Sequence, residues 1–143
     1  MARWHAHAIV VAALACAASA AAQPAGDARR FDGTWSVRLV CPTAPDGALG
    51  YTFVFPVTVS GGHLHGQRGT PGQPSSVTYD GTVRPDGRAT IAASGLTGDP
   101  SLNVGRVPRG YAYAYSFIAQ FDATHGHGQR TEGRPCVIDL TRQ

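Results

Sequence analysis

Aromatic side chains occupy alternate positions in residues 111–121, which read YAYAYSFIAQF and begin with Tyr111, Tyr113 and Tyr115. A cluster of phenol rings can hold a flat or amphipathic ligand by stacking and by hydrogen bonds from the hydroxyl groups. The same rings can instead fill the interior of a small β-barrel. The pattern therefore leaves two interpretations open, a ligand-binding pocket and a solid core.

The segment before these tyrosines, from Gly95 to Gly110, shows no strand pattern and carries Arg106 and Arg109. Long loops without regular structure are often lids or contact surfaces, although many are simply solvated. The planar guanidinium group of arginine suits a carboxylate or a phosphate. We therefore predict a ligand-binding site formed by the three tyrosines with Arg106 and Arg109 nearby.

Two His-x-His pairs, at residues 63–65 and 125–127, are candidates for metal ligands. Residues two apart on a strand share a face, so each pair could bind Zn²⁺ or Cu²⁺. Both pairs are expected beside hairpin turns and facing solvent, and no carboxylate lies nearby in the sequence at ligand spacing. We therefore predict no physiological metal site.

The sequence offers little for catalysis. It contains no Gly-x-Ser-x-Gly motif, no phosphate-binding glycine loop and no His-Glu-x-x-His motif. Several carboxylates occupy positions typical of turns, among them Asp46 and Asp86 in Pro-Asp-Gly. The chain is therefore predicted not to be an enzyme and to need no cofactor.

The charge balance is mild, with 12 Lys plus Arg against nine Asp plus Glu and a formal net charge of +3. Nucleic-acid binding would call for a clustered basic stripe, which the sequence lacks. A small molecule or a protein is the expected partner. At 143 residues, one domain is the default.

The N-terminus has the anatomy of a secretory signal peptide over residues 1–22, with an apolar stretch ending in small residues before Gln23. A lipid anchor on Cys16 is the alternative, although the residues before it fit a lipoprotein cleavage box poorly. We expect a flexible segment over residues 23–30 and a domain over residues 31–143. The mature protein is predicted to be periplasmic or secreted, without a transmembrane segment.

From Phe31 onward the apolar residues recur with a period of two, which predicts strands rather than helices. Turn residues separate eight such segments, and Pro56 indicates an edge or bulge within the second. The predicted strands span residues 33–42, 51–60, 63–69, 76–83, 88–95, 111–121, 127–133 and 136–142. The pattern predicts an all-β fold, an eight-stranded antiparallel up-and-down barrel, because closure buries the apolar face and removes both edges.

Two cysteines, Cys41 and Cys136, would remain after removal of the leader. In an oxidising compartment they are expected to form one disulfide. Cys41 ends the first predicted strand and Cys136 begins the last, and these ends meet in an up-and-down barrel with an even number of strands. The disulfide would therefore close the barrel.

The stretch GTWSV at residues 33–37 resembles the Gly-x-Trp signature of the calycins, the group that contains lipocalins and avidins. The later Gly-Gly turn followed by Leu64-x-Gly66 is also similar to avidins in its rhythm. The resemblance implies structural roles for Gly33 and Trp35. The tryptophan would plug the base of the barrel, packed against an arginine for which Arg142 and Arg134 are candidates.

The chain also departs from these families. Val37 stands where avidins have an asparagine that contacts biotin, and the lipocalin Thr-Asp-Tyr motif is missing. In general character the sequence resembles small exported proteins of proteobacteria. The sequence thus predicts an exported binding module for a small amphipathic or aromatic ligand at the barrel mouth. The alternative is a protein-binding or envelope-structural domain with a solid barrel core.

Overall fold

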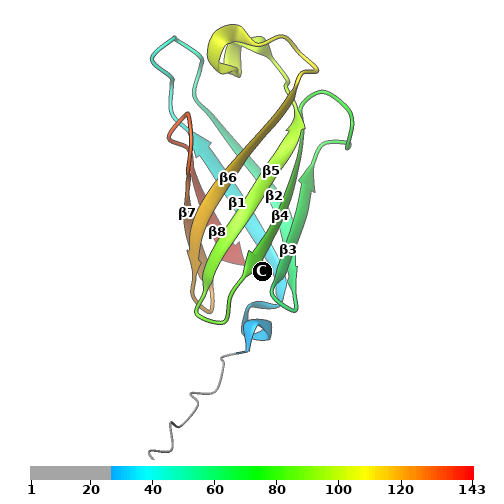
Figure 1. The fold of residues 1–143 in the computed structure, drawn as a ribbon, viewed down its shortest axis with the longest axis vertical. Coiled ribbons are helices and arrows are strands. Elements are labelled where there is room, and N and C mark those ends of the chain that lie inside the picture. The colour runs from blue at the N-terminus through cyan, green and yellow to red at the C-terminus, as the bar shows by residue number, and fades with distance from the viewer. Residues whose placement is uncertain (1–26) are drawn as a thin grey trace, which may run out of the picture.

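The computed structural model describes residues 27–143, which form a closed eight-stranded antiparallel barrel (Figure 1). The predicted signal peptide and residues 23–26 lie outside the described residues. Each strand pairs with the next one in the chain, and the predicted fold class is confirmed. The strands are β1 (Gly33–Cys41), β2 (Tyr51–Ser60), β3 (His63–Arg68), β4 (Ser76–Val83), β5 (Arg88–Leu96), β6 (Ala112–Phe121), β7 (His125–Arg130) and β8 (Val137–Arg142).

Pairing between β1 and β8 closes the barrel. The register runs from Trp35 opposite Arg142 to Val40 opposite Val137. The predicted disulfide joins Cys41 to Cys136 at the upper end of this seam, across 95 positions of the sequence. The prediction that the first and last strands are neighbours bridged by the two cysteines is therefore confirmed.

Strand alternation divides inward from outward side chains as the sequence pattern predicts. In β1, for example, Trp35, Val37 and Leu39 are buried while Thr34 and Arg38 are exposed. Only the seventh strand is shifted from its predicted range, because residues 131–136 form a loop rather than extended strand. The largest fully buried side chains are those of Trp35, Tyr79, Phe31, Phe117, Leu39, Leu64, Ile91, Ile138 and Leu140.

Pro56 lies where the second strand loses a partner. The ladder between β2 and β3 begins at Val57, so Pro56, which has no N–H group, donates nothing to it. On its other side, Pro56 stays in register with Ser36 of β1. The proline therefore sits at the end of one ladder without a bulge in the other.

A plug closes the lower end of the barrel. The short 3-10 helix η1 (Ala28–Phe31) places Phe31 against Phe121, and the indole N–H of Trp35 donates to the Phe31 carbonyl at 2.9 Å. The guanidinium carbon of Arg142 lies 5.6 Å from the centroid of the Trp35 ring. Of the two arginines considered from the sequence, Arg142 is therefore the one that packs on the tryptophan.

Gly33 starts β1 with a φ of +137°, a backbone conformation that favours glycine. A Cβ atom at this position would lie 3.5 Å from the Arg142 guanidinium group. The same guanidinium donates to the backbone carbonyls of Arg30, Asp32 and Ala123. Gly33 and Arg142 together tie the residues before β1 to the end of β8.

The two ends of the barrel differ in their connections. Tight turns join β2 to β3, β4 to β5 and β6 to β7 at the lower end, whereas longer loops lie at the upper end (Figure 1). The longest, residues 97–111, contains the 3-10 turns η2 (Pro100–Leu102) and η3 (Val104–Arg106) and arches over the upper end. No helix in residues 27–143 has the length and apolar character needed to cross a membrane.

Replacing both cysteines, in the variant Cys41→Ala/Cys136→Ala, should lower the free energy of unfolding by about 4–5 kcal/mol. The reason is that the disulfide closes a long loop and so restricts the unfolded chain. Urea unfolding at neutral pH measures the change, and chemically reduced wild-type protein should match the variant. A loss below about 1 kcal/mol would mean that strand pairing alone holds the β1–β8 seam.

Candidate functional site

The lower half of the barrel interior is filled. Tyr79 is fully buried, with its ring centroid 5.0 Å from that of Phe55 and 5.7 Å from that of Phe117. Below these rings, Trp35 and Phe121 pack edge to face at 5.0 Å. These contacts leave no room for a ligand in this part of the barrel.

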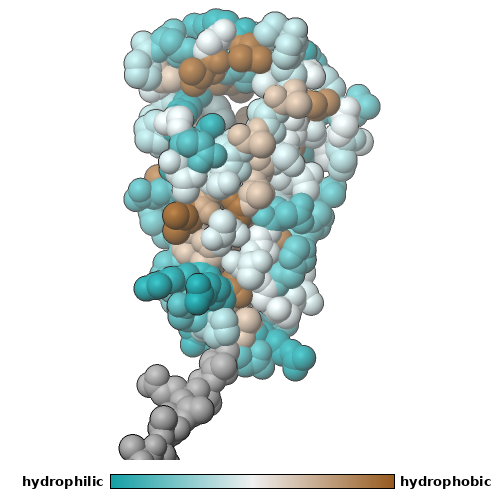
Figure 2. Space-filling model, in the orientation of Figure 1, coloured by the Kyte–Doolittle hydropathy of each residue, from teal (hydrophilic) through white to brown (hydrophobic). Residues whose placement is uncertain are grey.

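The upper half is hollow. A cavity of about 430 Å³ lies between the barrel walls and the loop 97–111. Figure 2 shows apolar residues gathered at this end of the molecule, with a hollow in the surface just beneath them. The walls of the cavity include Leu39, Tyr51, Phe53, Arg68, Val77, Leu96, Tyr113, Tyr115, Arg130 and Arg134. The loop residues that cover it include Asp99, Leu102, Asn103, Val104 and Val107.

Two pairs of aromatic rings face each other across this cavity, one on β2 and one on β6. Tyr51 and Phe53 have ring centroids 4.7 Å apart, and Tyr113 and Tyr115 stack almost parallel at 5.6 Å. In a closed eight-stranded barrel, strands four apart lie on opposite sides, so the two pairs form opposite walls. A flat ligand could lie between them.

An arginine covers the second ring of each pair. The guanidinium carbon of Arg68, at the end of β3, lies 3.7 Å from the Phe53 ring centroid. The guanidinium carbon of Arg130, at the end of β7, lies 4.1 Å from the Tyr115 ring centroid. Both distances allow a cation–π interaction, and both arginines line the cavity.

The two arginines differ in their hydrogen bonds. Arg68 donates to the Ser75 carbonyl at 3.2 Å, whereas the Nε of Arg130 is buried without a partner within the described part of the chain. Neither arginine forms a salt bridge with any carboxylate of residues 27–143. Arg130 therefore lines the cavity with a guanidinium group that has no counter-ion in the described residues.

Arg134 has a different role, because it fastens the loops around the cavity. This arginine is buried and donates to the carbonyls of Pro42, Ala48 and Leu49 in the β1–β2 loop. A further bond, of 2.9 Å, reaches the carbonyl of Leu102 in the loop that covers the cavity. Most N–H groups of the Arg134 side chain thus donate to backbone carbonyls of the protein. We therefore describe Arg134 as a structural clamp.

Burial keeps the cavity tyrosines neutral. Desolvation raises the pKa of Tyr115 to about 12, and it also raises the pKa of Tyr51 and of Tyr113. A neutral phenol can donate a hydrogen bond, which the hydroxyl of Tyr113 does to the Ser76 carbonyl at 2.9 Å. At neutral pH the aromatic walls therefore supply O–H groups and no negative charge.

The structure brings together only part of the site predicted from the sequence. Tyr113 and Tyr115 line the cavity, but the ring of Tyr111 is 59% exposed because this residue precedes β6 and lies outside its alternation. Arg106 donates to the Gly47 carbonyl on the adjacent loop. Arg109 is exposed, and neither it nor Arg106 lines the cavity.

Arg68 and Arg130 are not among the site residues predicted from the sequence, although both end a repeated segment. The segments 63–68 and 125–130 read HLHGQR and HGHGQR, and each ends in one of the two arginines. The same spacing relates Tyr51 to Tyr113 and Phe53 to Tyr115. The repeat therefore covers the whole Arg–aromatic arrangement on each side of the cavity.

Glycine recurs in both copies of the hexapeptide for a steric reason. A Cβ atom on Gly66 would lie 2.3 Å from a methyl carbon of Val57, and one on Gly128 would lie 2.7 Å from the Cβ of Ala119. These are the cross-strand partners of the two glycines. Packing thus explains the repeated glycine, but it does not explain the repeated arginine.

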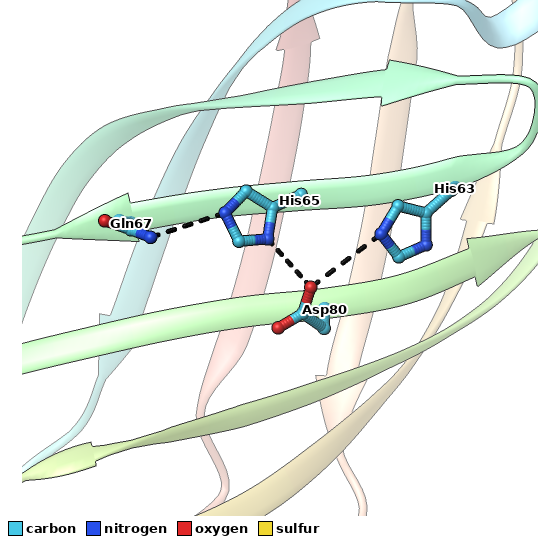
Figure 3. A network of polar contacts seen from close by, with 4 residues as sticks. All are labelled: His63, His65, Gln67 and Asp80. Carbon is cyan, nitrogen blue, oxygen red and sulfur yellow. Dashed lines mark hydrogen bonds and ion pairs between the residues drawn. The ribbon is translucent and has the colours of Figure 1, made fainter. Parts of the chain in front are cut away.

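The histidines of both His-x-His pairs are exposed, as expected, and Figure 3 shows the first pair beside Asp80. His65 Nδ1 is 2.8 Å from Asp80 Oδ1, and His63 Nε2 is 3.8 Å from the same oxygen. His127 pairs with Asp139 at 2.8 Å in the same way. The neighbouring strands supply carboxylates that sequence spacing could not reveal, because these are cross-strand partners.

The described residues contain no cluster of three or more His, Cys, Asp or Glu side chains able to hold a metal ion. His65 and Asp80, like His127 and Asp139, are exposed cross-strand pairs of the kind that stabilises a sheet modestly. A wider hollow of about 690 Å³ lies on the outer wall near Thr90, Ile118 and Gln120. Its lining is largely exposed side chains, so the upper cavity, which lies within the barrel beneath the loop 97–111, is the better candidate site.

Comparison of this chain with known protein families, with curated proteins and with solved structures found no match. We therefore infer function from the geometry of the cavity.

Alkaline pH should destabilise the protein through its buried tyrosines. Above pH 10 the unfolded state loses phenol protons that the folded state retains, so stability falls as pH rises toward 12. The Tyr115→Phe variant should lose about 1 kcal/mol less than wild type between pH 8 and pH 11, as measured by urea unfolding. Tyr111→Phe, at an exposed ring, serves as the control and should follow wild type; an equal loss in Tyr115→Phe would contradict the assignment.

Removing the clamp, in Arg134→Gln, should free the cavity cover by leaving buried carbonyls without their charged donor. We expect a loss of about 2 kcal/mol in unfolding free energy. Hydrogen exchange of the Leu49 amide, which donates to the Ser101 carbonyl at 2.8 Å across the two loops, should accelerate. The exposed variant Arg88→Gln is the control, and unchanged exchange at Leu49 would show that Arg134 does not hold the cover.

Proposed function

We propose that this chain is an exported binding module for a small amphipathic or aromatic ligand, held in the cavity at the upper end of the barrel. The observation that carries this proposal is the cavity of about 430 Å³, bounded by four aromatic rings in an otherwise filled barrel. Sites for small ligands are typically of this size, largely apolar, and supplied with a few polar groups.

The chemistry of the walls supports a flat ligand with a polar end. Tyr51 and Phe53 face Tyr113 and Tyr115 across the space, and ring stacking gives these side chains an affinity for planar molecules. Besides the tyrosine hydroxyls, the charged groups of the lining lie at strand ends and in loops. An amphipathic ligand would therefore place its apolar part between the rings and its polar part toward Arg68 or Arg130.

The barrel type supports the same reading. An eight-stranded barrel is just wide enough to be filled by side chains or to hold one small ligand, and here each alternative applies to one half. The packing of Arg142 on Trp35 at the base is what the resemblance to calycins implies. We therefore propose a calycin-like barrel whose ligand enters at the end opposite the tryptophan.

Export is part of the proposal. The Cys41–Cys136 disulfide favours an oxidising compartment, since such bonds persist mainly outside the cytosol. Together with the predicted signal peptide, it supports a periplasmic or secreted protein. The alternative, a structural domain with a solid core, fits only the lower half of the interior.

Calorimetric titration with 8-anilinonaphthalene-1-sulfonate, an aromatic and amphipathic probe, tests the proposal. We expect saturable binding of one molecule per chain. Leu102→Trp, which adds a large side chain on the cavity cover, should weaken binding at least tenfold by filling the space. Val54→Trp, at an exposed position on the outside of β2, is the matched control and should bind as wild type does.

Equal binding by the two tryptophan variants would place the probe elsewhere on the protein. Absence of binding to folded wild-type protein would also contradict a ligand site in the cavity.

A further inference from the structure

We infer that the ligand of the upper cavity is an organic anion, with a carboxylate or sulfonate group at Arg130 and an apolar body between the aromatic walls. This inference rests on the proposed function, and it adds the charge of the ligand and the residue that recognises it.

The first support is the charge of the walls. Three guanidinium groups, on Arg68, Arg130 and Arg134, line the cavity together with one carboxylate, that of Asp99. Asp99 accepts a hydrogen bond from the Ser101 amide at 2.8 Å, which lowers the pKa of its carboxyl group, and it pairs with no arginine of residues 27–143. The cavity thus has an excess of positive charge that no protein group neutralises.

The second support is the position of Arg130. Its guanidinium carbon lies 4.1 Å from the Tyr115 ring centroid, and the group lines the cavity without a salt bridge to any carboxylate of residues 27–143. A ligand oxygen in the cavity would accept hydrogen bonds from this guanidinium, and charge-assisted bonds of this kind are strong. The other two cavity arginines have acceptors in the protein, because Arg134 donates to backbone carbonyls and Arg68 donates to the Ser75 carbonyl.

Arg68 and Arg130 act on the same space. Burial raises the pKa of Tyr113, and the positive charges of both arginines partly offset that rise. The two arginines come from opposite strands, β3 and β7, and both line the cavity that Tyr113 also lines. An anion held at Arg130 would also feel the charge of Arg68.

The third support is the repeat. Both hexapeptides end in arginine, and in both the arginine covers an aromatic ring of the preceding strand. Packing accounts for the repeated glycine, and cation–π contact holds each arginine against its ring, but neither supplies a counter-charge. An anionic ligand would supply one, because the arginine fork matches a carboxylate or sulfonate in shape and charge.

The test compares two probes that differ in one group. N-phenyl-1-naphthylamine has the same two-ring system and anilino group as 8-anilinonaphthalene-1-sulfonate but lacks the sulfonate. We expect the anionic probe to bind folded wild-type protein about tenfold to a hundredfold more tightly than the neutral one. Raising the salt concentration should weaken only the anionic probe.

Variants of Arg130 locate the preference. Arg130→Gln should bring the affinity for the anionic probe down to that of the neutral probe, while Arg130→Lys, which retains the charge, should recover part of it. Arg38→Gln removes one charge from the exposed outer face of β1 and should leave both affinities unchanged. Circular dichroism confirms that each variant is folded before titration.

The outcomes separate the inference from the function on which it rests. Equal affinities for the two probes, both reduced by Leu102→Trp, would leave the cavity as a ligand site and overturn the anionic ligand. An anion preference that survives in folded Arg130→Gln would overturn the role of Arg130. Failure of both probes to bind wild-type protein would overturn the inference together with the proposed function.

Discussion

Closure of the sheet between β1 and β8 is the constraint on which the rest of this structure depends. An open sheet would leave one apolar face in water and two unpaired edges, whereas the closed barrel encloses that face and has no edge. The Cys41–Cys136 bond lies at the upper end of the seam, next to the cavity, while Arg142 and Trp35 lie at its lower end. The seam is thus fastened at both ends, and the interior has a fixed width along its length. Within this closed barrel, side chains can either fill the interior or leave part of it empty.

The two halves of the barrel differ in how far side chains fill the interior, because their large residues are placed differently. In the lower half, Trp35 packs on Phe121, and Tyr79 packs on Phe55 and Phe117, so rings from different strands meet in the interior. In the upper half, ring pairs lie along opposite walls, and an arginine covers the lower ring of each pair. The space between the two pairs is the cavity. The same residues that end the hydrophobic core therefore begin the cavity.

The sequence predicts the fold better than the site, and the reason is physical. The alternation with a period of two and the position of the two cysteines at strand ends can both be read directly from the sequence. Together they predict the barrel and its closure. Tyr113 and Tyr115 were placed correctly in the wall because they belong to the same alternation. Tyr111 continues the same alternation in the sequence, but it lies one residue before the β6 ladder begins, so strand pairing does not hold its ring in the wall. Arg106 points to a neighbouring loop through contacts that local sequence does not encode. For Arg68 and Arg130, the sequence feature that indicates a shared role is the repeated hexapeptide that each of them ends.

The repeat also explains how one chain builds two facing walls. Strands β2 and β3 carry the first Arg–aromatic arrangement, and β6 and β7, four strands further around the barrel, carry the second. Similar sequences in these positions face each other across the axis, so the cavity has two similar walls. The walls are not equivalent, however, because Phe53 on one side is replaced by Tyr115 on the other, and only Arg68 has a backbone acceptor. The wall of β6 and β7 therefore carries two phenols and the unpaired guanidinium of Arg130. The opposite wall carries one phenol, that of Tyr51, a plain ring and the partnered guanidinium of Arg68. A ligand bound between them would meet more free hydrogen-bonding groups on the first wall, and this difference would favour one orientation.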